Sequence, residues 1–247
     1  MKKYELTNET VEICGHKLSR IRALTDFGGV KAGDLGGYVE SESNLSHDGS
    51  AWIYGNAKVF GNAKVCNTAE VYDSAWIYGN AKVSGNARVC GKAWVCGNAK
   101  VCGNAKVCGN AKVCNTAEVY DSAKVCGNAK VCGNAVVRDS AEVFNGAKVY
   151  GNAVVRDSAG ICGSAEICSN DDYLCVKGLG SYNRHMTFYR STNGVSVKCG
   201  CFNGTLDDFA AKVVDTHGNN KYAKEYMAMV RVVKIYFGLE DNKNEKV

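Results

Sequence analysis

The residues best suited to binding chemistry lie in the last third of the chain. Residues 178–184, GLGSYNR, combine two glycines and a serine with Arg184, so their backbone amides, hydroxyl and guanidinium could hold a phosphate group. The segment matches neither the P-loop nor the Rossmann fingerprint, and an interdomain turn with a surface arginine is the alternative interpretation. Tyr189 and Arg190 follow in an expected strand, where only one of the two side chains can face a site.

Two cysteines in the sequence CGCF raise a second possibility. Cys199 and Cys201 would share one face of an extended strand, and His185 or His217 could act as the base that activates a thiol as a nucleophile. A packed strand end is the alternative interpretation. We assign no catalytic residue, metal site or cofactor, and the candidate ligand-binding residues are Gly178, Gly180, Ser181, Arg184, Tyr189, Arg190 and Cys201.

The composition is that of a folded, soluble protein. The 247 residues are 46% hydrophobic and 22% charged, with a net charge of +5, 14 cysteines and no proline. No apolar run reaches the roughly 18 residues of a membrane span, and no apolar segment follows the first lysines to make a secretory signal. We therefore expect a cytoplasmic location and no membrane partner. So mild a basic charge does not indicate nucleic acid.

A six-residue repeat occupies the middle of the chain and must position everything else. Residues 49–168 form twenty consecutive units of the type GNAKVC without an insertion, with valine or isoleucine in the fifth place and alanine two residues earlier. The alternation within a unit is the period of a strand, and Gly-Asn tolerates the positive φ of a corner. Short strands joined by two-residue corners predict a coil whose faces stack in parallel.

This repeat resembles the hexapeptide repeat of left-handed parallel β-helix proteins, in which three hexads make one triangular coil. The predicted fold class is therefore mainly β, with a left-handed parallel β-helix over residues 49–168, an N-terminal β cap and first irregular coil over 1–48, and a small α+β domain over 169–247. Many such proteins are acyltransferases with a histidine base and an inserted loop. The hexads have neither, and the lack of histidine between His47 and His185 also argues against a γ-carbonic anhydrase.

Three hexads per coil would place residues 18 apart above one another on the outer faces. The slot after the valine holds ten of the fourteen cysteines, mostly in vertical columns with a spacing of about 4.8 Å. We interpret them as small apolar surface residues in a slot otherwise filled by tyrosine or phenylalanine. Disulfides between stacked cysteines and metal binding are the alternatives.

The slot before the valine carries lysine in nine of the twenty hexads. Stacked lysines would be better tolerated opposite an anionic partner, although lysines that spread into water are the simpler interpretation. Aromatic side chains interrupt one column and form an expected partner surface of Trp76, Tyr78, Trp94, Lys112 and Lys130. This surface would suit a ring-bearing anion, a protein partner or a subunit interface, and the hexapeptide resemblance favours a homotrimer.

Both ends of the chain leave the repeat. Two strands are expected around Gly15-His16, and Leu35, Val39 and Leu45 continue the hexad phase imperfectly, as in an irregular first coil. These residues would cap the N-terminal end of the β-helix.

The C-terminal domain is expected to combine strands and helices. Strands are predicted in YLCVKG and MTFYR, with a hairpin turn at Asn193-Gly194. Thr205 and Asp208 form a capping box before a first helix, and a second helix covers residues 221–237. The apolar side of the first helix consists of Leu206, Phe209, Ala210, Val213 and Val214. One side of the second helix carries Tyr222, Tyr226, Met229, Val230 and Val233.

The segments GLGSYNRHMTFYR, CGCFNGTLDDF and NNKYAKEY are similar to a C-terminal domain of phage and prophage hexapeptide-repeat proteins of unassigned activity, and RIRALTDFGGVKAGDLGGYVESESNLS fits the same proteins. The resemblance implies a host-cell cytoplasmic location. We expect a non-catalytic binding or scaffold protein that acts on a host component, either by sequestering an anionic nucleotide-like ligand or by occluding a host protein in counter-defence. An acyltransferase-like or cysteine-dependent enzyme using the C-terminal domain and a structural virion component are the alternatives.

Overall fold

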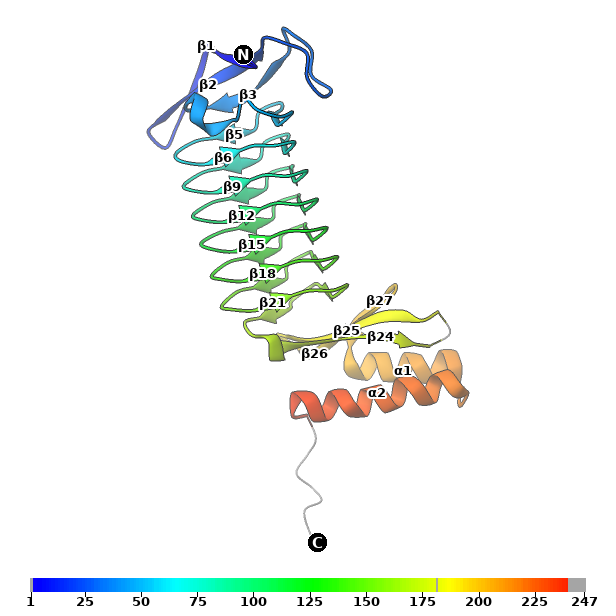
Figure 1. Ribbon diagram of the computed structural model, residues 1–247. Coiled ribbons are helices and arrows are strands. Elements are labelled where there is room, and N and C mark those ends of the chain that lie inside the picture. The colour runs from blue at the N-terminus through cyan, green and yellow to red at the C-terminus, as the bar shows by residue number, and fades with distance from the viewer. Residues whose placement is uncertain (1, 181, 240–247) are drawn as a thin grey trace.

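The chain forms a long β-helix with a β cap at one end and a small α+β domain at the other (Figure 1). The computed structural model describes residues 2–180 and 182–239. The predicted mainly β fold, with its parallel β-helix between two different ends, is confirmed. No helix in these described ranges is long and apolar enough to cross a membrane.

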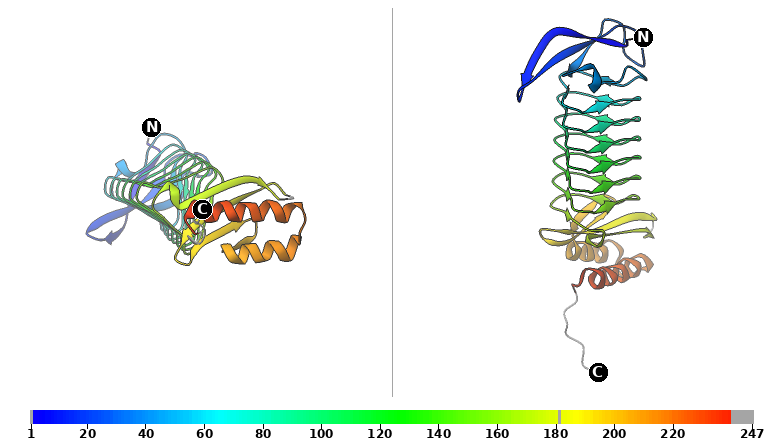
Figure 2. Two further views of the ribbon diagram at one scale, coloured as in Figure 1. Left: turned by 90° about the horizontal axis from the view of Figure 1, so that it is seen from below. Right: turned by 60° about the vertical axis from the view of Figure 1, so that its left-hand side comes forward.

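The β-helix has three flat faces, and each face is a parallel sheet of two-residue strands (Figure 2). The valine or isoleucine and the alanine of every hexad are fully buried, because successive side chains of a strand point to opposite faces. Strands pair with a spacing of 18 residues, as Val89 does with Val107 and Val95 with Val113. The predicted three hexads per coil are therefore confirmed.

The strands of the three faces follow the repeat without a break. The ten-stranded sheet begins in the cap and consists of β1 (Tyr4–Ile13), β2 (His16–Ala23), β3 (Leu35–Val39), β5 (Lys58–Val59), β8 (Trp76–Ile77), β11 (Trp94–Val95), β14 (Lys112–Val113), β17 (Lys130–Val131), β20 (Lys148–Val149) and β23 (Glu166–Ile167). The seven-stranded sheet consists of β4 (Trp52–Ile53), β7 (Glu70–Val71), β10 (Arg88–Val89), β13 (Lys106–Val107), β16 (Lys124–Val125), β19 (Glu142–Val143) and β22 (Gly160–Ile161). The six-stranded sheet consists of β6 (Lys64–Val65), β9 (Lys82–Val83), β12 (Lys100–Val101), β15 (Glu118–Val119), β18 (Val136–Val137) and β21 (Val154–Val155).

The corners explain the Gly-Asn pair of the repeat. Gly97 has a φ of 69°, and Asn115, which takes its place one coil later, has a φ of 60°. These left-handed conformations favour glycine and asparagine over other residues. The second corner residue builds ladders, since the side-chain amide of Asn80 donates to the side-chain oxygen of Asn98 at 2.9 Å.

Most backbone hydrogen bonds between coils point the same way. Outside the strand ladders, an amide donates to the carbonyl of the next coil, as Trp94 does to Ala111 at 2.9 Å. The first coil is therefore left mainly with free carbonyls and the last coil mainly with free amides. At the N-terminal end, the buried ammonium of Lys3 donates to the carbonyls of Gly49 and Ala51 at 3.3 and 2.9 Å.

The other cap residues follow the same polarity. The side-chain amide of Asn44 donates to two more first-coil carbonyls. At the C-terminal end most of the cap contacts are made by acceptors: the Asp172 carboxylate accepts from the amides of Cys168 and Ser169, both at 2.8 Å, and the Thr187 hydroxyl accepts from a third amide at 3.0 Å. At both ends, cap side chains thus satisfy backbone groups that the outermost coil leaves open.

The N-terminal cap differs from its prediction in two details. β1 and β2 form the expected antiparallel hairpin, but its turn lies at Cys14-Gly15, one residue earlier than predicted. The 3-10 helix η1 (Glu42–Asn44) follows β3. Val39 and Leu45 are fully buried as expected, whereas Leu35 is 54% exposed because it begins a cap strand and does not belong to a coil.

The C-terminal domain packs one sheet against two helices. After the 3-10 helix η2 (Asn170–Asp172), the antiparallel sheet consists of β24 (Tyr173–Leu179), β25 (Arg184–Ser191), β26 (Gly194–Cys199) and β27 (Phe202–Thr205), and it is followed by α1 (Leu206–His217) and α2 (Lys221–Phe237). The sheet lies under the last coil, and the helices cover its opposite face (Figure 1). The predicted capping box is present, with the Thr205 hydroxyl accepting from the Asp208 amide at 3.1 Å. Val214 was expected on the buried side but is 55% exposed.

Candidate functional site

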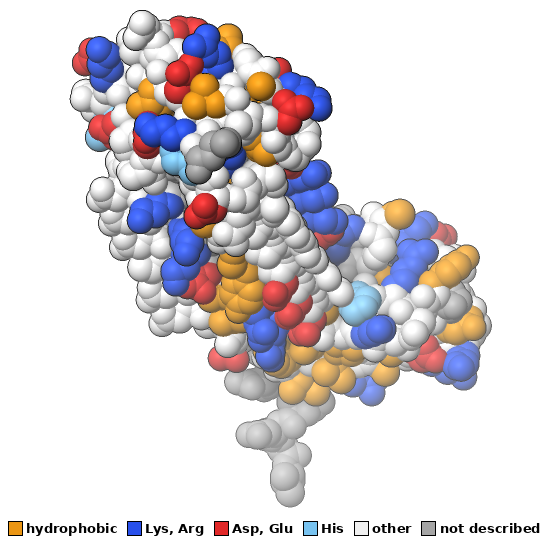
Figure 3. All heavy atoms as spheres, turned by 45° about the horizontal axis from the view of Figure 1, so that its top comes forward, with side chains coloured by type: hydrophobic (Ala, Val, Ile, Leu, Met, Phe, Trp, Pro, Cys, Tyr) orange, Lys and Arg blue, Asp and Glu red, His pale blue; other side chains and the backbone are white. Residues whose placement is uncertain are grey.

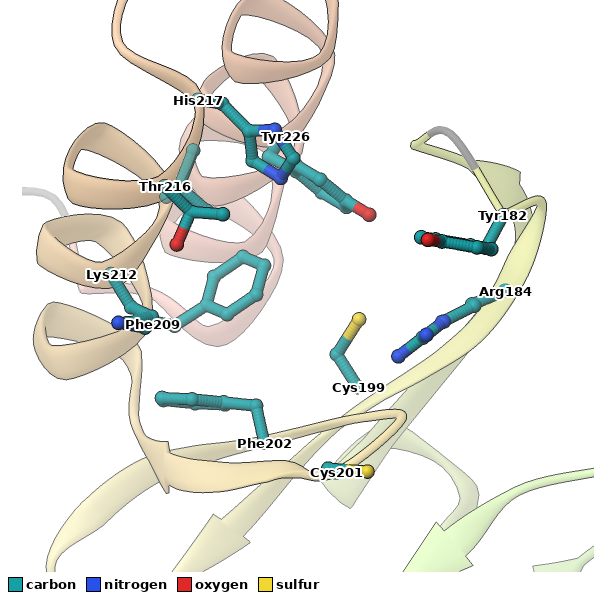
Figure 4. A pocket seen from close by; sticks show the side chains of 11 residues that line it. Tyr182, Arg184, Cys199, Cys201, Phe202, Phe209, Lys212, Thr216, His217 and Tyr226 are labelled. Carbon is teal, nitrogen blue, oxygen red and sulfur yellow. The ribbon is translucent and has the colours of Figure 1, made fainter.

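A pocket opens between the C-terminal sheet and its two helices (Figure 4). Its volume is about 260 Å³. The start of β25, the end of β26 and the turn between β26 and β27 form one side, and α1 and α2 form the other. The pocket is lined by Tyr182, Arg184, Cys199, Cys201, Phe202, Phe209, Lys212, Val213, Thr216, His217 and Tyr226.

Aromatic rings make most of the apolar wall. Phe209 of α1 lies edge-on to Phe202 and to Tyr226, with ring centroids 5.4 and 5.6 Å apart. His217, at the end of α1, packs against Tyr226 with a centroid distance of 5.7 Å. These residues come together because α1 and α2 both turn their apolar sides toward the sheet. The wall offers ring edges and faces to a flat ligand.

The charged groups at the pocket are all basic. The Arg184 guanidinium lies over the ring of Tyr182, 4.7 Å from its centroid, and points toward the cavity (Figure 4). Lys212 is the second cation, and its ammonium is 2.8 Å from the exposed Asp215. His217 adds a third nitrogen base. None of the described side chains that line the pocket is acidic. Because Asp215 offsets the charge of Lys212, Arg184 is the main group that would attract an anion.

Gly200 makes room for the Arg184 guanidinium. It has a φ of +56°, and a Cβ at this position would collide with the end of the Arg184 side chain. The tight turn between β26 and β27 thus favours glycine for its backbone, and a larger residue would displace the Arg184 side chain that crosses it.

The glycine-rich segment before Arg184 has a different role from the one that its composition suggests. The amide of Gly180 already donates to a carboxylate oxygen of Glu225 at 3.1 Å, so it is occupied. A Cβ on Gly180 would collide with the Tyr226 hydroxyl, which explains the glycine by packing. Gly178 lies in β24 with a φ of +100°, and the predicted Ser181 lies outside the described residues.

The two cysteines of CGCF do not share a face. Cys199 ends β26 and is 8% exposed, whereas Cys201 lies in the turn and is exposed, because the chain reverses there instead of continuing as a strand. Burial raises the pKa of the Cys199 thiol, against a smaller lowering effect of Arg184. Among the described residues neither thiol hydrogen-bonds to a histidine, and His185 faces a separate cleft beside the last coils. The pair therefore lacks the features of an activated nucleophile.

Tyr189 and Arg190 lie on opposite faces of β25, as predicted, and neither reaches the pocket. Tyr189 is 1% exposed and faces the β-helix, where its hydroxyl is 3.0 Å from the Cys162 sulfur. Arg190 lies beside Asp172, with 3.4 Å between the guanidinium Nε and a carboxylate oxygen. Of the predicted ligand-binding residues, the structure brings Arg184 and Cys201 together at one pocket.

Sequence reasoning missed most of the pocket. Phe209, Val213 and Tyr226 were predicted only as the apolar sides of helices, and Tyr182, Phe202 and Lys212 were not singled out at all. The available signal was that Lys212 follows Phe209 by three residues, and so lies one turn along α1 beside its apolar side. Which element packs against that side is decided by the tertiary structure, so the signal alone does not indicate a pocket.

The aromatic surface on the ten-stranded sheet is less exposed than expected. Trp76 and Trp94 are only partly exposed because they stack on each other, with ring centroids 5.7 Å apart. The Lys112 ammonium lies 4.1 Å from the Trp94 ring centroid, which is a close cation–π contact. Tyr78 stacks on Phe60 at 5.2 Å, and Lys130 is exposed one coil beyond Lys112.

The outer faces also carry ion pairs and free thiols. Lysines and carboxylates 18 residues apart pair along the faces, as Lys100 does with Glu118 at 2.8 Å, and acidic and basic side chains lie side by side in Figure 3. All fourteen cysteines are free. Cys162 is an exception to the outward pattern, since the C-terminal domain buries it. Within residues 2–180 and 182–239, no group of three or more His, Cys, Asp or Glu side chains is arranged to hold a metal ion.

One family model matches part of the chain. The YdcK β-solenoid repeat matches residues 81–97, which cover almost one coil and include β9 to β11. Together with the stacked parallel coils, this match places the chain among β-solenoid proteins by architecture. The matched segment includes neither the cap nor the pocket. A comparison with curated proteins gives no match.

Proposed function

We propose that this chain is a non-catalytic binding protein whose C-terminal pocket takes a small anion that carries an aromatic ring, in the manner of a nucleotide. The observation that carries the proposal is the combination of a lining without acidic groups, two cations and an aromatic wall in one cavity. The β-helix acts as a rigid support that holds this domain at a fixed distance from the cap.

Different side chains of the pocket would contact the anionic group and the ring of the ligand. Arg184 presents a planar guanidinium, which matches the oxygens of a phosphate or carboxylate in a two-pronged contact. Phe202, Phe209 and Tyr226 offer edges and faces to a ring. The volume of about 260 Å³ lies just below the roughly 300–1,000 Å³ of drug-sized sites, so one ring system with one anionic group is the expected ligand size.

Binding is better supported than thiol catalysis. Burial raises the pKa of Cys199, which keeps the thiol protonated and therefore weakly nucleophilic near neutral pH. The resemblance to phage and prophage proteins adds the proposal that the ligand is a host signalling nucleotide and that binding sequesters it in the host cytoplasm. A homotrimer, expected from the hexapeptide repeat, would present three such pockets.

Isothermal titration calorimetry with adenosine monophosphate as the probe tests the proposal. Adenosine supplies the ring without the anion, and inorganic phosphate supplies the anion without the ring. We expect adenosine monophosphate to bind more tightly than either part. Arg184→Gln should weaken binding about tenfold or more, because a charge-assisted hydrogen bond contributes about 1.5–3 kcal/mol.

Arg231→Gln is the matched control, since Arg231 is exposed on α2 and does not line the pocket. If Arg184→Gln binds adenosine monophosphate as tightly as Arg231→Gln does, Arg184 does not contribute to the site. If none of the four ribonucleoside monophosphates binds to folded protein, the proposed function fails. Mass spectrometry of purified virions distinguishes the proposed binding function from a structural role, because a structural component would be present in the virion in stoichiometric amount.

A further inference from the structure

The helix α2 carries apolar side chains on two opposite sides, and only one of these sides is covered. The covered side faces the C-terminal sheet and α1. On the opposite side Val232 and Ile235 are 50% and 62% exposed, and Ala228 is also exposed. These three residues follow one another at intervals of four and three, which places them in one line along the helix. We call them the outer stripe.

This concentration of exposed apolar side chains is peculiar to α2. Nine large apolar side chains are exposed in the part of the chain that the structure describes, and four of them lie on α2. A fifth, Leu239, directly follows the Gly238 cap of this helix, whereas none lies on the β-helix. Single exposed apolar residues need no explanation, but such a cluster on one helix is typical of an interaction surface.

The described part of the chain leaves the outer stripe uncovered. The helices α1 and α2 lie side by side at the end of the molecule, and the β-helix lies on the far side of the sheet (Figures 1 and 2). Residues 240–247, EDNKNEKV, contain one apolar residue, Val247, so they do not offer a matching apolar surface. A second molecule is therefore needed to cover the stripe.

The two outer helices carry opposite charges, which indicates what that molecule is. Three aspartates and one lysine give α1 a net charge of −2, and three lysines, one arginine and one glutamate give α2 a net charge of +3. A second copy turned onto this face, by a two-fold rotation about an axis parallel to the helices, would bring α2 of each copy over α1 of the other. Opposite charges then meet twice. An anionic membrane would meet the aspartates as well as the lysines.

The antiparallel packing of α1 and α2 predicts which charges would meet. His217 at the end of α1 packs against Tyr222 at the start of α2, with ring centroids 6.1 Å apart. Counting back from His217 and forward from Tyr222, Asp215 and Lys224 lie at the same height along the two helices. Both side chains are exposed. A rotation about an axis parallel to the helices keeps these heights, so Lys224 would face Asp215 of the second copy.

We propose that the outer face of α1 and α2 is a homodimer interface, in which the outer stripe of each copy packs against the helix layer of the other. One turn beyond the charged pair, Ala228 lies at the height of the exposed Ala211 of the second copy, and two such small side chains let helices approach closely. Val232 and Ile235 would leave water on association. The inference is independent of the ligand pocket, because none of these residues lines it.

Analytical ultracentrifugation of the full-length reduced protein over a range of concentrations tests the interface. The wild-type mass should be twice that of Ile235→Asp, whatever contacts the β-helix faces make. A carboxylate in an apolar contact should raise the dissociation constant of the dimer at least tenfold. Leu35→Asp is the matched control, since Leu35 is 54% exposed on the cap, and it should keep the wild-type mass. Circular dichroism confirms that each variant is folded.

Exchanging the two charges tests the partner and its orientation. Lys224→Asp and Asp215→Lys should each weaken the dimer a few-fold, because each replaces an attraction between exposed charges by a repulsion. An equal mixture of the two variants should form heterodimers about as tight as the wild type, because both contacts then pair opposite charges across the axis.

Four outcomes would overturn the proposal. They are equal masses of wild type and Ile235→Asp at every concentration, an equal loss of mass in Leu35→Asp, and a mixture of the charge variants that associates no more tightly than either variant alone. The fourth is a monomer that sediments with phosphatidylserine vesicles and loses this binding in Ile235→Asp, which would assign the outer stripe to a membrane.

Discussion

At the scale of single residues, the pocket depends on two glycines whose lack of a side chain leaves space for neighbouring groups. Gly180 leaves space for the Tyr226 hydroxyl, and Gly200 leaves space for the Arg184 guanidinium. The two glycines lie in different turns, yet each admits a polar group that lines the same cavity. A glycine that composition alone would assign to phosphate binding can therefore serve a site by being small.

Gly200→Ala should weaken binding of adenosine monophosphate, because the added Cβ pushes the Arg184 guanidinium away from the position that it now occupies. The positive φ also strains the alanine by about 1 kcal/mol. Gly194→Ala is the matched control, since Gly194 has a φ of +92° but open space around it. Calorimetry should show weaker binding only for Gly200→Ala, while thermal unfolding shows both variants destabilised. Unchanged affinity in Gly200→Ala would contradict this role of Arg184.

At the scale of elements, the β-helix has a polarity opposite to that of an α-helix. Most of its free carbonyls lie at the N-terminal end and most of its free amides at the C-terminal end, and accordingly a cation, Lys3, contacts carbonyls of the first coil and a carboxylate, Asp172, contacts amides of the last. Oriented backbone dipoles of this kind act as fixed partial charges. The two caps are therefore matched to their own ends by charge as well as by shape.

Lys3→Met should destabilise the protein by about 1–3 kcal/mol near neutral pH, because two buried carbonyls lose their donor. Burial lowers the pKa of Lys3 to about 8. Between pH 8 and 10 the folded state therefore releases this proton while the unfolded state keeps it, so the contribution of Lys3 to stability rises with pH. The difference in unfolding free energy between wild type and Lys3→Met should grow over this range, as measured by urea denaturation. The exposed Lys17→Met serves as control, and a difference that stays flat would argue against a depressed Lys3 pKa.

At the scale of the whole molecule, the coil of 18 residues is the unit of construction. Each coil contacts only its neighbours, so stability is close to a sum over coils and their interfaces. An insertion or deletion keeps each residue on its face, in its column and in its corner ladder only when it adds or removes whole coils.

Deleting residues 97–114 removes one coil and leaves every later residue on its own face. We expect a cooperative thermal transition, a Tm lower by only a few degrees and unchanged ligand affinity. Deleting residues 97–99 removes far less chain but places a corner where a strand should be, and it should lower Tm more. Differential scanning calorimetry of the two variants decides the point. A smaller loss for the three-residue deletion would contradict the coil as the cooperative unit.

The sequence alone was enough for the β-helix and for the Asn193-Gly194 hairpin and both helices of the C-terminal domain, but not for the turn at Gly200-Cys201 or for β27. Few backbone arrangements are compatible with side chains that alternate inward and outward and with a corner at every sixth position. The Thr205–Asp208 capping box marks the start of α1 by local hydrogen bonding. The exposure of Leu35 and Val214 escaped prediction, because it depends on which neighbouring element covers each residue. Local pattern cannot supply that information.

The repeat thus determined the three-sided scaffold, the vertical columns on its faces and the need for caps, since these follow from period and alternation along the chain. Only the tertiary structure decided the pocket, because Arg184, Phe209 and Tyr226 come from three elements that meet by packing.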